Sequence, residues 1–233
     1  MLGDFAEINQ TMVIQLAIIV LIVGLTIYNA IRNKKLLESV TKYSRGTRSE
    51  RKLVLKLLKY GIPSKTIFHD LYVEKQKGKY AQIDLVVLTS VGVLVFEVKD
   101  YSGWIYGNNS PKWTQVLAYG RMKYRFYNPI MQNNKHIIDL RKKSNQFENI
   151  PFFSIIVFYG DCVIKDFGYV PYRTFIVKPR SINKLISSIL KNADPAEYTD
   201  KREAVQVLKD AVKNGESEEI RRSHIARIQN MFG

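Results

Sequence analysis

Two apolar runs near the middle of the chain are separated by a short turn-like segment. The runs are Ile83–Leu88 and Val93–Val98, and the segment between them is Thr89–Gly92. Runs rich in Val, Leu and Ile on either side of a short turn are typical of a β-hairpin. The pattern therefore predicts two adjacent antiparallel strands, around which the rest of the chain is organised.

The predicted hairpin brings charged side chains onto a face that is otherwise apolar. If the turn is centred between Ser90 and Val91, Asp84 lies opposite Glu97 across the two strands. Because side chains alternate between the faces of a strand, Lys99 shares the face of Glu97. Like charges directly opposite one another are destabilising, and a buried carboxylate is costly unless something compensates it. The hairpin thus contains a candidate site of two carboxylates and a lysine.

Two interpretations of this site are open from spacing alone. A divalent cation such as Mg²⁺ would compensate both carboxylates and polarise a phosphodiester, while the lysine orients the attacking water or stabilises developing negative charge. The structural alternative is that Glu97 pairs with Lys99 or another basic side chain, and that Asp84 lies at a solvated strand edge.

The segment before the hairpin predicts an amphipathic helix. Leucine and valine side chains form one apolar stripe along Thr47–Tyr60, and Gly61 ends the helix. Glu50 lies on this stripe, so its carboxylate points toward the core and can join the two hairpin carboxylates. The spacing of Thr47 and Glu50 also fits a capping box, in which Glu50 bonds back to the Thr47 amide. Both interpretations of Glu50 stay open.

Further strands are expected on both sides of the hairpin. Ile67–Val73 predicts a strand, and Glu74–Tyr80 an exposed basic turn leading into the hairpin. After the hairpin, Trp104–Gly107 and Trp113–Leu117 predict a second pair of strands. Gln115 lies in the later strand, where it can either hydrogen-bond near the site or face solvent.

The segment Arg121–Tyr127 interleaves basic and aromatic residues. Such a pattern suits a nucleic-acid surface of phosphate contacts and stacking rings, and it equally suits an amphipathic edge strand.

Asn128 as N-cap and Pro129 at the first helical position then predict a helix to about residue 145. Gln132 and His136 share one face of its early turns. The rest of the chain predicts two strands and three helices, at Phe152–Tyr159, Thr174–Val177, Ile182–Leu190, Thr199–Lys213 and Glu216–Met231.

The N-terminal part of the chain contains an apolar segment long enough to cross a membrane. Ile8–Ile31 contains no charged side chain, and roughly 20 apolar residues cross the hydrocarbon core of a bilayer. We therefore expect Met12–Ile31 to be a transmembrane helix. A cleavable signal peptide is disfavoured by Asp4 and Glu7 and by the lack of Lys or Arg before the apolar run, and a buried core helix is the remaining alternative.

Basic residues crowd the far side of this helix. The positive-inside rule then places the N-terminus outside and everything after the helix in the cytoplasm. Between Arg32 and Lys65 there are eleven Lys or Arg against only Glu38 and Glu50. This basic flank could contact anionic lipid headgroups or DNA phosphates.

Composition narrows the classes of partner and cofactor. The 233 residues are 46% hydrophobic and 24% charged, which is ordinary for a globular protein, but the net charge of +15 predicts an anionic partner. Because Cys162 is the single cysteine, an internal disulfide framework and a cysteine-rich zinc site are excluded. We expect Cys162 to be a buried, unreactive thiol. His69, His136 and His224 lack the spacing of zinc ligands. A phosphate-binding glycine loop and a plausible Ser-His-Asp set are also absent from the sequence.

Several short motifs occur together and in a fixed order: Gly46-x-x-x-Glu50, Gln82-Ile83-Asp84, Phe96-Glu97-Val98-Lys99 with Ser102-Gly103 after it, and Asn128-Pro129-x-x-Gln132. In this combination, over roughly Tyr43–Leu140, the chain resembles the NERD, or nuclease-related domain, family. The sequence has Ile83 where the superfamily signature often has proline, and Ser49 where a glycine often precedes the helix glutamate. Neither departure removes a chemical group.

The resemblance implies an α/β fold of the restriction-endonuclease-like, PD-(D/E)XK type, in which a mixed sheet flanked by helices carries a metal-dependent phosphodiesterase site. By matching position, Asp84 and Glu97 would ligate Mg²⁺ or Mn²⁺, and Lys99 would serve the attacking water. Glu50 would be the helix acid, and Gln115 and Gln132 are further members of the implied site.

Three segments are expected along the chain. Residues 1–34 form the single transmembrane anchor and its basic flank, residues 35–160 the nuclease-like domain, and residues 161–233 a strand and C-terminal helices that complete or cap it. We therefore expect a membrane-anchored domain, facing the cytoplasm, that hydrolyses phosphodiester bonds of DNA with a divalent metal. Two alternatives are a nucleic-acid-binding module without catalysis and a membrane-surface interaction protein whose basic segment holds anionic lipid.

Overall fold

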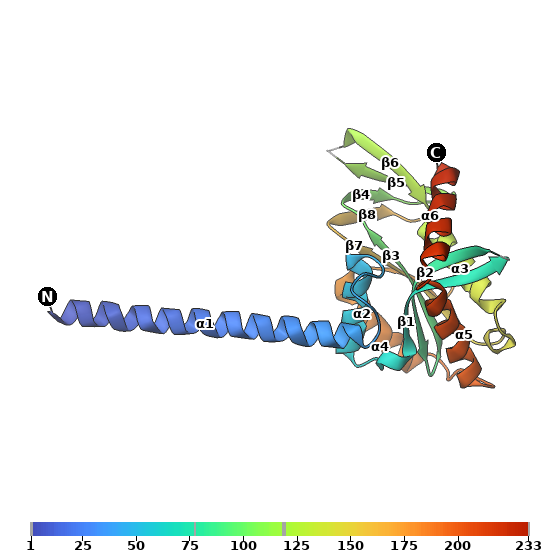
Figure 1. Cartoon of the computed structure of the whole chain (residues 1–233). Helices are drawn as coiled ribbons and strands as arrows, with labels where there is room; N and C mark the ends of the chain where they lie inside the picture. Colours follow the sequence, from blue (N-terminus) through green and yellow to red (C-terminus); the bar gives the residue numbers. More distant parts are fainter. Residues whose placement is uncertain (1, 77, 118–119, 233) are drawn as a thin grey trace.

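A computed structural model describes residues 2–76, 78–117 and 120–232, as one long helix followed by a folded body (Figure 1). Helix α1 (Leu2–Glu38) projects away from the body, and every side chain of residues 12–31 is exposed. Within the described residues, Met12–Glu38 is the one helical segment long and apolar enough to cross a membrane, with a mean hydropathy of 2.3. A membrane span and a signal sequence both have this character.

The body combines helices with two β-sheets. Its helices are α2 (Arg48–Tyr60), α3 (Pro129–Arg141), α4 (Ile182–Asn192), α5 (Lys201–Asn214) and α6 (Glu218–Phe232), with 3₁₀ turns at Ser64–Thr66, Asn145–Phe147 and Pro179–Ser181. Its strands are β1 (Ile67–Gln76), β2 (Lys79–Thr89), β3 (Gly92–Asp100), β4 (Gly103–Tyr106), β5 (Lys112–Leu117), β6 (Met122–Tyr127), β7 (Phe152–Tyr159), β8 (Cys162–Asp166) and β9 (Thr174–Val177). The fold is therefore of the predicted α/β class.

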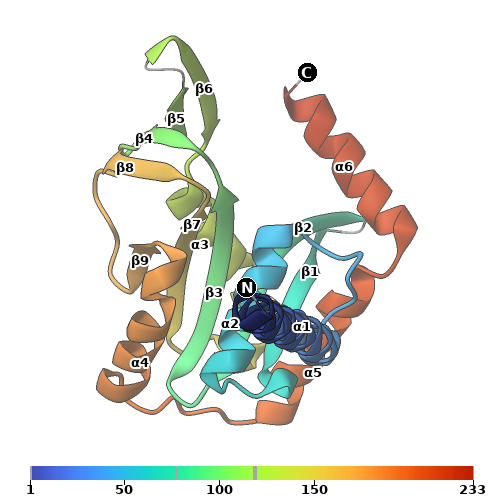
Figure 2. The same ribbon diagram turned by 90° about the vertical axis from the view of Figure 1, so that its left-hand side faces the viewer.

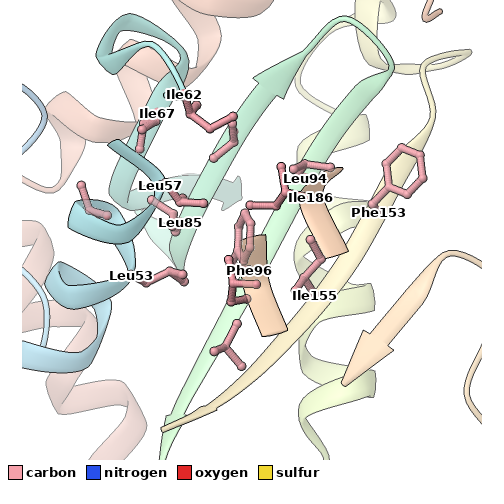
Figure 3. Close-up of a cluster of buried hydrophobic side chains, with 14 of the residues drawn as sticks. Leu53, Leu57, Ile62, Ile67, Leu85, Leu94, Phe96, Phe153, Ile155 and Ile186 are labelled. Carbon is pink, nitrogen blue, oxygen red and sulfur yellow. The ribbon is translucent and has the colours of Figure 1, made fainter. Parts of the chain in front are cut away.

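The larger sheet is mixed and lies between two layers of helices. Its strand order is β1-β2-β3-β7-β9, antiparallel from β1 to β3 and parallel from β3 to β9. Helices α2 and α4 cover one face, where Leu53 and Ile186 pack against Leu85 and Phe96 (Figure 3). Helices α3 and α5 cover the other face through Leu140 and Leu208 among others. Burying side chains of this size contributes roughly 1.5–3 kcal/mol each.

The central hairpin has the predicted register. Leu85 pairs with Phe96, and Thr89 pairs with Gly92, so only Ser90 and Val91 form the turn. Alternation along β3 then puts Glu97 on the face of Val93 and Val95, which is the face that α3 covers.

A smaller sheet continues from the carboxyl end of β3, at one end of the body (Figure 2). Its strand order is β6-β5-β4-β8. The chain enters it at Gly103, where φ is +73° and a Cβ atom would meet the backbone oxygen of Val116. A glycine is needed here because both the backbone conformation and the close approach exclude a side chain.

Three local expectations need correction. The exposed turn predicted at Glu74–Tyr80 is shorter, because β1 continues to Gln76 and β2 starts at Lys79. Helix α3 ends at Arg141 rather than near residue 145. Strand β8 was not expected. It pairs in parallel with β4, a long-range interaction that its short local pattern does not encode.

A buried ion pair ties the start of the body to β1 and α5. Arg45 Nε donates to Asp70 Oδ2 at 3.0 Å, and its other nitrogens donate to the carbonyl oxygens of Asp70 and Val212. Asp70 itself has a φ of +56°, which interrupts the pairing of β1 with β2. Because Arg45 is only 5% exposed, it does not contribute to the basic surface assigned to it from the sequence.

Replacing Arg45 by alanine should therefore destabilise the body. Leaving Asp70 buried without its partner is expected to reduce the free energy of unfolding by about 3–5 kcal/mol. Denaturant unfolding of the full chain in uncharged micelles, followed by tryptophan fluorescence, measures the change. Arg48→Ala is the matched control, since Arg48 is exposed and should shift stability by less than about 0.5 kcal/mol. Equal stability of the two variants would contradict the role of this ion pair.

Candidate active site

Strand β3 and helix α3 together hold a buried cluster of polar side chains. Lys99 Nζ lies 2.6 Å from Glu97 Oε1 and donates to Gln132 Oε1 at 3.0 Å. His136 Nε2 lies 3.4 Å from Glu97 Oε2. The two-residue period of the strand brings Glu97 and Lys99 to one face, and the four-residue spacing on α3 brings Gln132 and His136 to meet them.

Asp84 faces this cluster from β2. Its Oδ2 accepts a hydrogen bond of 2.7 Å from the Val98 backbone N–H, which fixes the carboxylate beside β3. Burial raises the pKa of Asp84 well above its ordinary value, and the negative charges of Glu97 and Glu50 raise it further, while Lys99 opposes the shift. The carboxylates of Asp84 and Glu97 therefore repel one another, as the hairpin register predicts.

The charges of Glu97 and Lys99 support each other. Burial alone would raise the pKa of Glu97, but Lys99 and His136 bring it below its usual value. Burial alone would lower the pKa of Lys99, but the carboxylates of Glu97 and Asp84 raise it. At neutral pH the pair is thus an ionised carboxylate and an ammonium group, and Asp84 is the carboxyl group that protonates most readily.

Glu50 forms a second group on the α2 side. The Thr47 hydroxyl accepts from the Glu50 backbone N–H at 3.3 Å and donates to Glu50 Oε1 at 2.7 Å, so Thr47 caps the helix and the Glu50 carboxylate bonds to its hydroxyl. Glu50 Oε2 lies 3.3 Å from His69 Nε2, and His69 Nδ1 lies 2.8 Å from the Thr41 hydroxyl. Burial raises the pKa of Glu50, but hydrogen bonds from His69 and Thr47 outweigh burial and lower it. Glu50 is coupled to the hairpin through its charge on Asp84.

The spacing Gly46-x-x-x-Glu50 has a steric cause. Gly46 has a φ of +61°, and a Cβ atom there would collide with the Glu50 carboxylate and the His69 ring. Beside Glu50, Ser49 donates a hydrogen bond to the Asp100 carboxylate at the end of β3. These contacts hold the N-terminus of α2 against the two strands that carry the site.

Gln115 lies outside the hydrogen-bonded cluster. Its Nε2 donates to the Ser102 carbonyl oxygen at 2.8 Å, in the connection that leaves β3. The structure therefore brings together Asp84, Glu97, Lys99 and Gln132, places Glu50 next to them on the other side of Asp84, and leaves Gln115 bonded to the following loop.

Two buried histidines that contact the site were not predicted as members of it. His136 was visible through its spacing from Gln132, but nothing in the sequence showed that α3 would pack over Glu97. His69 contacts Glu50 from a strand that is distant in the sequence, so no local pattern could have paired them. Both histidines act on the carboxylates of the site rather than on one another.

One carboxylate oxygen of the cluster makes no hydrogen bond. Glu97 Oε2 is buried with His136 Nε2 3.4 Å away, while Oε1 of the same side chain is paired with Lys99. A carboxylate oxygen without a hydrogen bond, beside a second carboxylate, suits a hard cation. Across the residues described, however, no set of three or more His, Cys, Asp and Glu side chains is arranged to hold a metal. The protein would supply two carboxylates at most, and water or substrate oxygens would supply the rest.

The mixed sheet and this side-chain set define an α/β protein with a paired-carboxylate and lysine site on a central hairpin. The family model described as a nuclease-related domain, NERD, matches residues 45–159. The chain belongs to this family. It is also 30% identical, over 192 residues, to the uncharacterized protein pXO1-01 of Bacillus anthracis, covering 78% of this chain and 82% of that protein. No solved structure matches the chain significantly.

The raised pKa of Asp84 makes a prediction about stability and pH. A group whose pKa is higher in the folded state stabilises the fold while protonated, and that contribution is lost as the pH rises through the folded value. Asp84→Asn cannot ionise, so its stability relative to the natural chain should increase as the pH rises above 3.8, the ordinary value for aspartate. Thermal unfolding of both proteins from about pH 4 to about pH 8 measures the difference.

Asp194→Asn is the matched control, because Asp194 is exposed. Its stability should follow that of the natural chain at every pH. If the curve for Asp84→Asn also stays parallel to the natural chain, the charge of Asp84 is not opposed by its surroundings.

Proposed function

We propose that this protein is a metal-dependent nuclease that hydrolyses phosphodiester bonds of DNA. The observation that carries the proposal is the partly buried cluster of Asp84, Glu97 and Lys99 on the central hairpin, in a chain of the nuclease-related domain family. A net charge of +15 suits a polyanionic substrate.

The donor set fits Mg²⁺ or Mn²⁺. Asp84 and Oε2 of Glu97 would hold the ion, since both are hard oxygen ligands and Oε2 accepts no hydrogen bond, with His136 Nε2 3.4 Å away. When bound, such an ion polarises a phosphodiester and lowers the pKa of a bound water. It would also remove the repulsion between the two carboxylates.

The chain's own residues would position the reacting groups. Lys99 is held by Glu97 Oε1 and Gln132 Oε1, and its raised pKa keeps it protonated. It would therefore act as a hydrogen-bond donor to the attacking water or to a phosphate oxygen, rather than as a base. Glu50 would act through its charge on Asp84, and Gln115 remains a sequence-based candidate from the adjoining strand.

We also propose that α1 anchors the enzyme in the cell membrane as a single span, with its N-terminus outside and the body in the cytoplasm. The exposed apolar side chains along the helix and the basic residues after it support this orientation. A hollow of about 660 Å³ between α1 and α2 is lined by Lys34, Arg48, Arg51 and Lys52. It lies where anionic headgroups would meet the protein, which favours a contact with acidic lipid.

A nucleic-acid-binding module without catalysis is the second candidate. The ion pair between Glu97 and Lys99 favours it, because the pair compensates one carboxylate without any metal. Residues 161–233 would serve either function in the same way, since β9 extends the larger sheet and α4 and α5 cover its faces.

Cleavage assays distinguish these functions. The full chain in uncharged micelles, with Mg²⁺ or Mn²⁺, should cut at least one of supercoiled, linear duplex and single-stranded DNA. Asp84→Ala and Lys99→Ala should each reduce the rate on the order of 10²- to 10³-fold, because Asp84 would hold the metal ion and Lys99 would stabilise the charge that develops on the reacting phosphate. Gel electrophoresis of the products gives the rates.

The matched controls are Asp194→Ala and Lys184→Ala, which remove the same kinds of charge from exposed positions. Both should cleave as the natural chain does. Intact substrates in every lane, under conditions where a control nuclease is active, would instead support the binding module.

The orientation of the anchor can be tested separately. Cys162 is buried, so it should not react with a membrane-impermeant thiol reagent in intact cells. Gly3→Cys should be labelled from outside, whereas Lys184→Cys should be labelled only after the cells are opened. Labelling of Lys184→Cys in intact cells would show that the body lies outside, opposite to the proposed orientation. Release of the chain from membranes by alkaline washing would show that α1 does not span the membrane.

A further inference from the structure

The smaller sheet has one face that packs on the body and one that does not. Ile105 and Trp113 are buried against Phe158 and Ile130, so this side of the sheet belongs to the core. Neighbouring positions on β4 and β5 must point the opposite way. The outer face of the smaller sheet is therefore defined by Trp104 and Tyr106 on β4 and by the residues paired with them.

Strand pairing arranges this outer face in two rows. Trp104 pairs with Val116, which in turn pairs with Lys123, and Tyr106 pairs with Thr114, which pairs with Arg125. Residues directly opposite each other share a face. Each row thus runs from an aromatic ring on β4 to a cation on the edge strand β6.

Both rings are accessible. Trp104 is 40% exposed and Tyr106 is 41% exposed, although large aromatic side chains usually bury most of their surface. With Val116, Lys123 and Arg125 they line a shallow hollow of about 780 Å³. The hollow is open to solvent and combines flat apolar surface with positive charge.

The charged side chains of the outer face are mostly basic. Lys112 extends the face on β5, and Lys165 Nζ lies 5.2 Å from the centre of the Trp104 ring. Among the described residues of these strands, the one acidic side chain near Tyr106 is Asp166, and its carboxylate accepts hydrogen bonds from the Phe167 and Gly168 amides of its own loop. A polyanion with flat apolar groups would match this surface.

We propose that the outer face binds single-stranded nucleic acid, with bases stacked on Trp104 and Tyr106 and phosphates on Lys123 and Arg125. Exposed aromatic rings on a four-stranded sheet can stack on base faces, which a duplex does not offer. The two rings are two residues apart on one strand, about 6.6 Å, which is roughly twice the stacking rise in a duplex. Such spacing suits an extended strand whose bases are separated.

Binding of the strand to the outer face is independent of the proposed function, but cleavage of the bound strand rests on it. Trp104 follows Lys99 by five positions, so their backbones lie at most about 18 Å apart. A strand of a few nucleotides held on the outer face could therefore reach the cluster on β3. The substrate class would be single-stranded DNA or RNA, or a duplex end or gap that exposes unpaired bases.

Binding in the presence of a chelator tests the inference without any cleavage. The probes are a labelled single strand of about 12 nucleotides, the same strand lacking its bases, and a blunt duplex of equal length. Fluorescence anisotropy with the full chain in uncharged micelles should show the single strand binding most tightly. Trp104→Ala or Tyr106→Ala should each weaken it by roughly 5- to 150-fold and leave the base-free strand unaffected.

Further variants separate stacking from charge and from misfolding. Trp104→Phe keeps a ring and should restore most of the affinity, while Tyr172→Ala removes an exposed ring elsewhere and should change nothing. Lys123→Ala should weaken all phosphate-bearing probes and reduce the salt dependence by about 0.7 per lost contact. Lys184→Ala is its control.

Equal binding of the base-free strand, or unchanged binding by the ring variants, would overturn the inference. Tighter binding of anionic vesicles than of the single strand, lost in the same ring variants, would assign the face to the membrane instead. Strand binding that requires the rings but is never followed by cleavage would keep this inference and reject the proposed nuclease. Cleavage that is unchanged in the ring variants would support the proposed nuclease and reject this inference.

Discussion

The carboxylates of Asp84 on β2 and Glu97 on β3 lie close enough to raise the pKa of Asp84, in a site where burial weakens the screening of their charges by water. The two-residue turn at Ser90 and Val91 sets the register of β2 against β3. This register brings the two carboxylates close together. Lys99 compensates one oxygen of Glu97, and the Val98 amide compensates one oxygen of Asp84. Burial, and after it the charges of Glu97 and Glu50, raise the pKa of Asp84 well above its ordinary value.

The surrounding structure keeps this arrangement from relaxing. Helix α3 covers the cluster and directs Gln132 and His136 toward Lys99 and Glu97. On the other side, α2 holds Glu50 through its own N-cap and His69, and Gly46 leaves room for both. Because these supports come from well-packed helices, moving a carboxylate away would also disrupt the core around it.

Local patterns in the sequence were enough to predict the hairpin, its register and the group of Asp84, Glu97 and Lys99. Capping signals at Thr47 and Asn128 likewise located α2 and α3, because each depends only on neighbouring residues. Contacts between distant segments were not predictable. The parallel pairing of β8, the burial of Arg45 on Asp70 and the approach of His69 to Glu50 all depend on tertiary packing. Gln115 was plausible from its strand, but its hydrogen bond to Ser102 depends on the loop between two sheets.

Calorimetric titration of Mn²⁺ into the full chain shows whether the carboxylates of Asp84 and Glu97 form a metal site. Binding should tighten as the pH rises, because the ion must displace a proton from Asp84. Asp84→Asn and Glu97→Gln should each weaken it at least about tenfold, while Asp194→Asn should not. If the natural chain does not bind Mn²⁺, or if all four proteins bind it equally, the two carboxylates do not form a metal site.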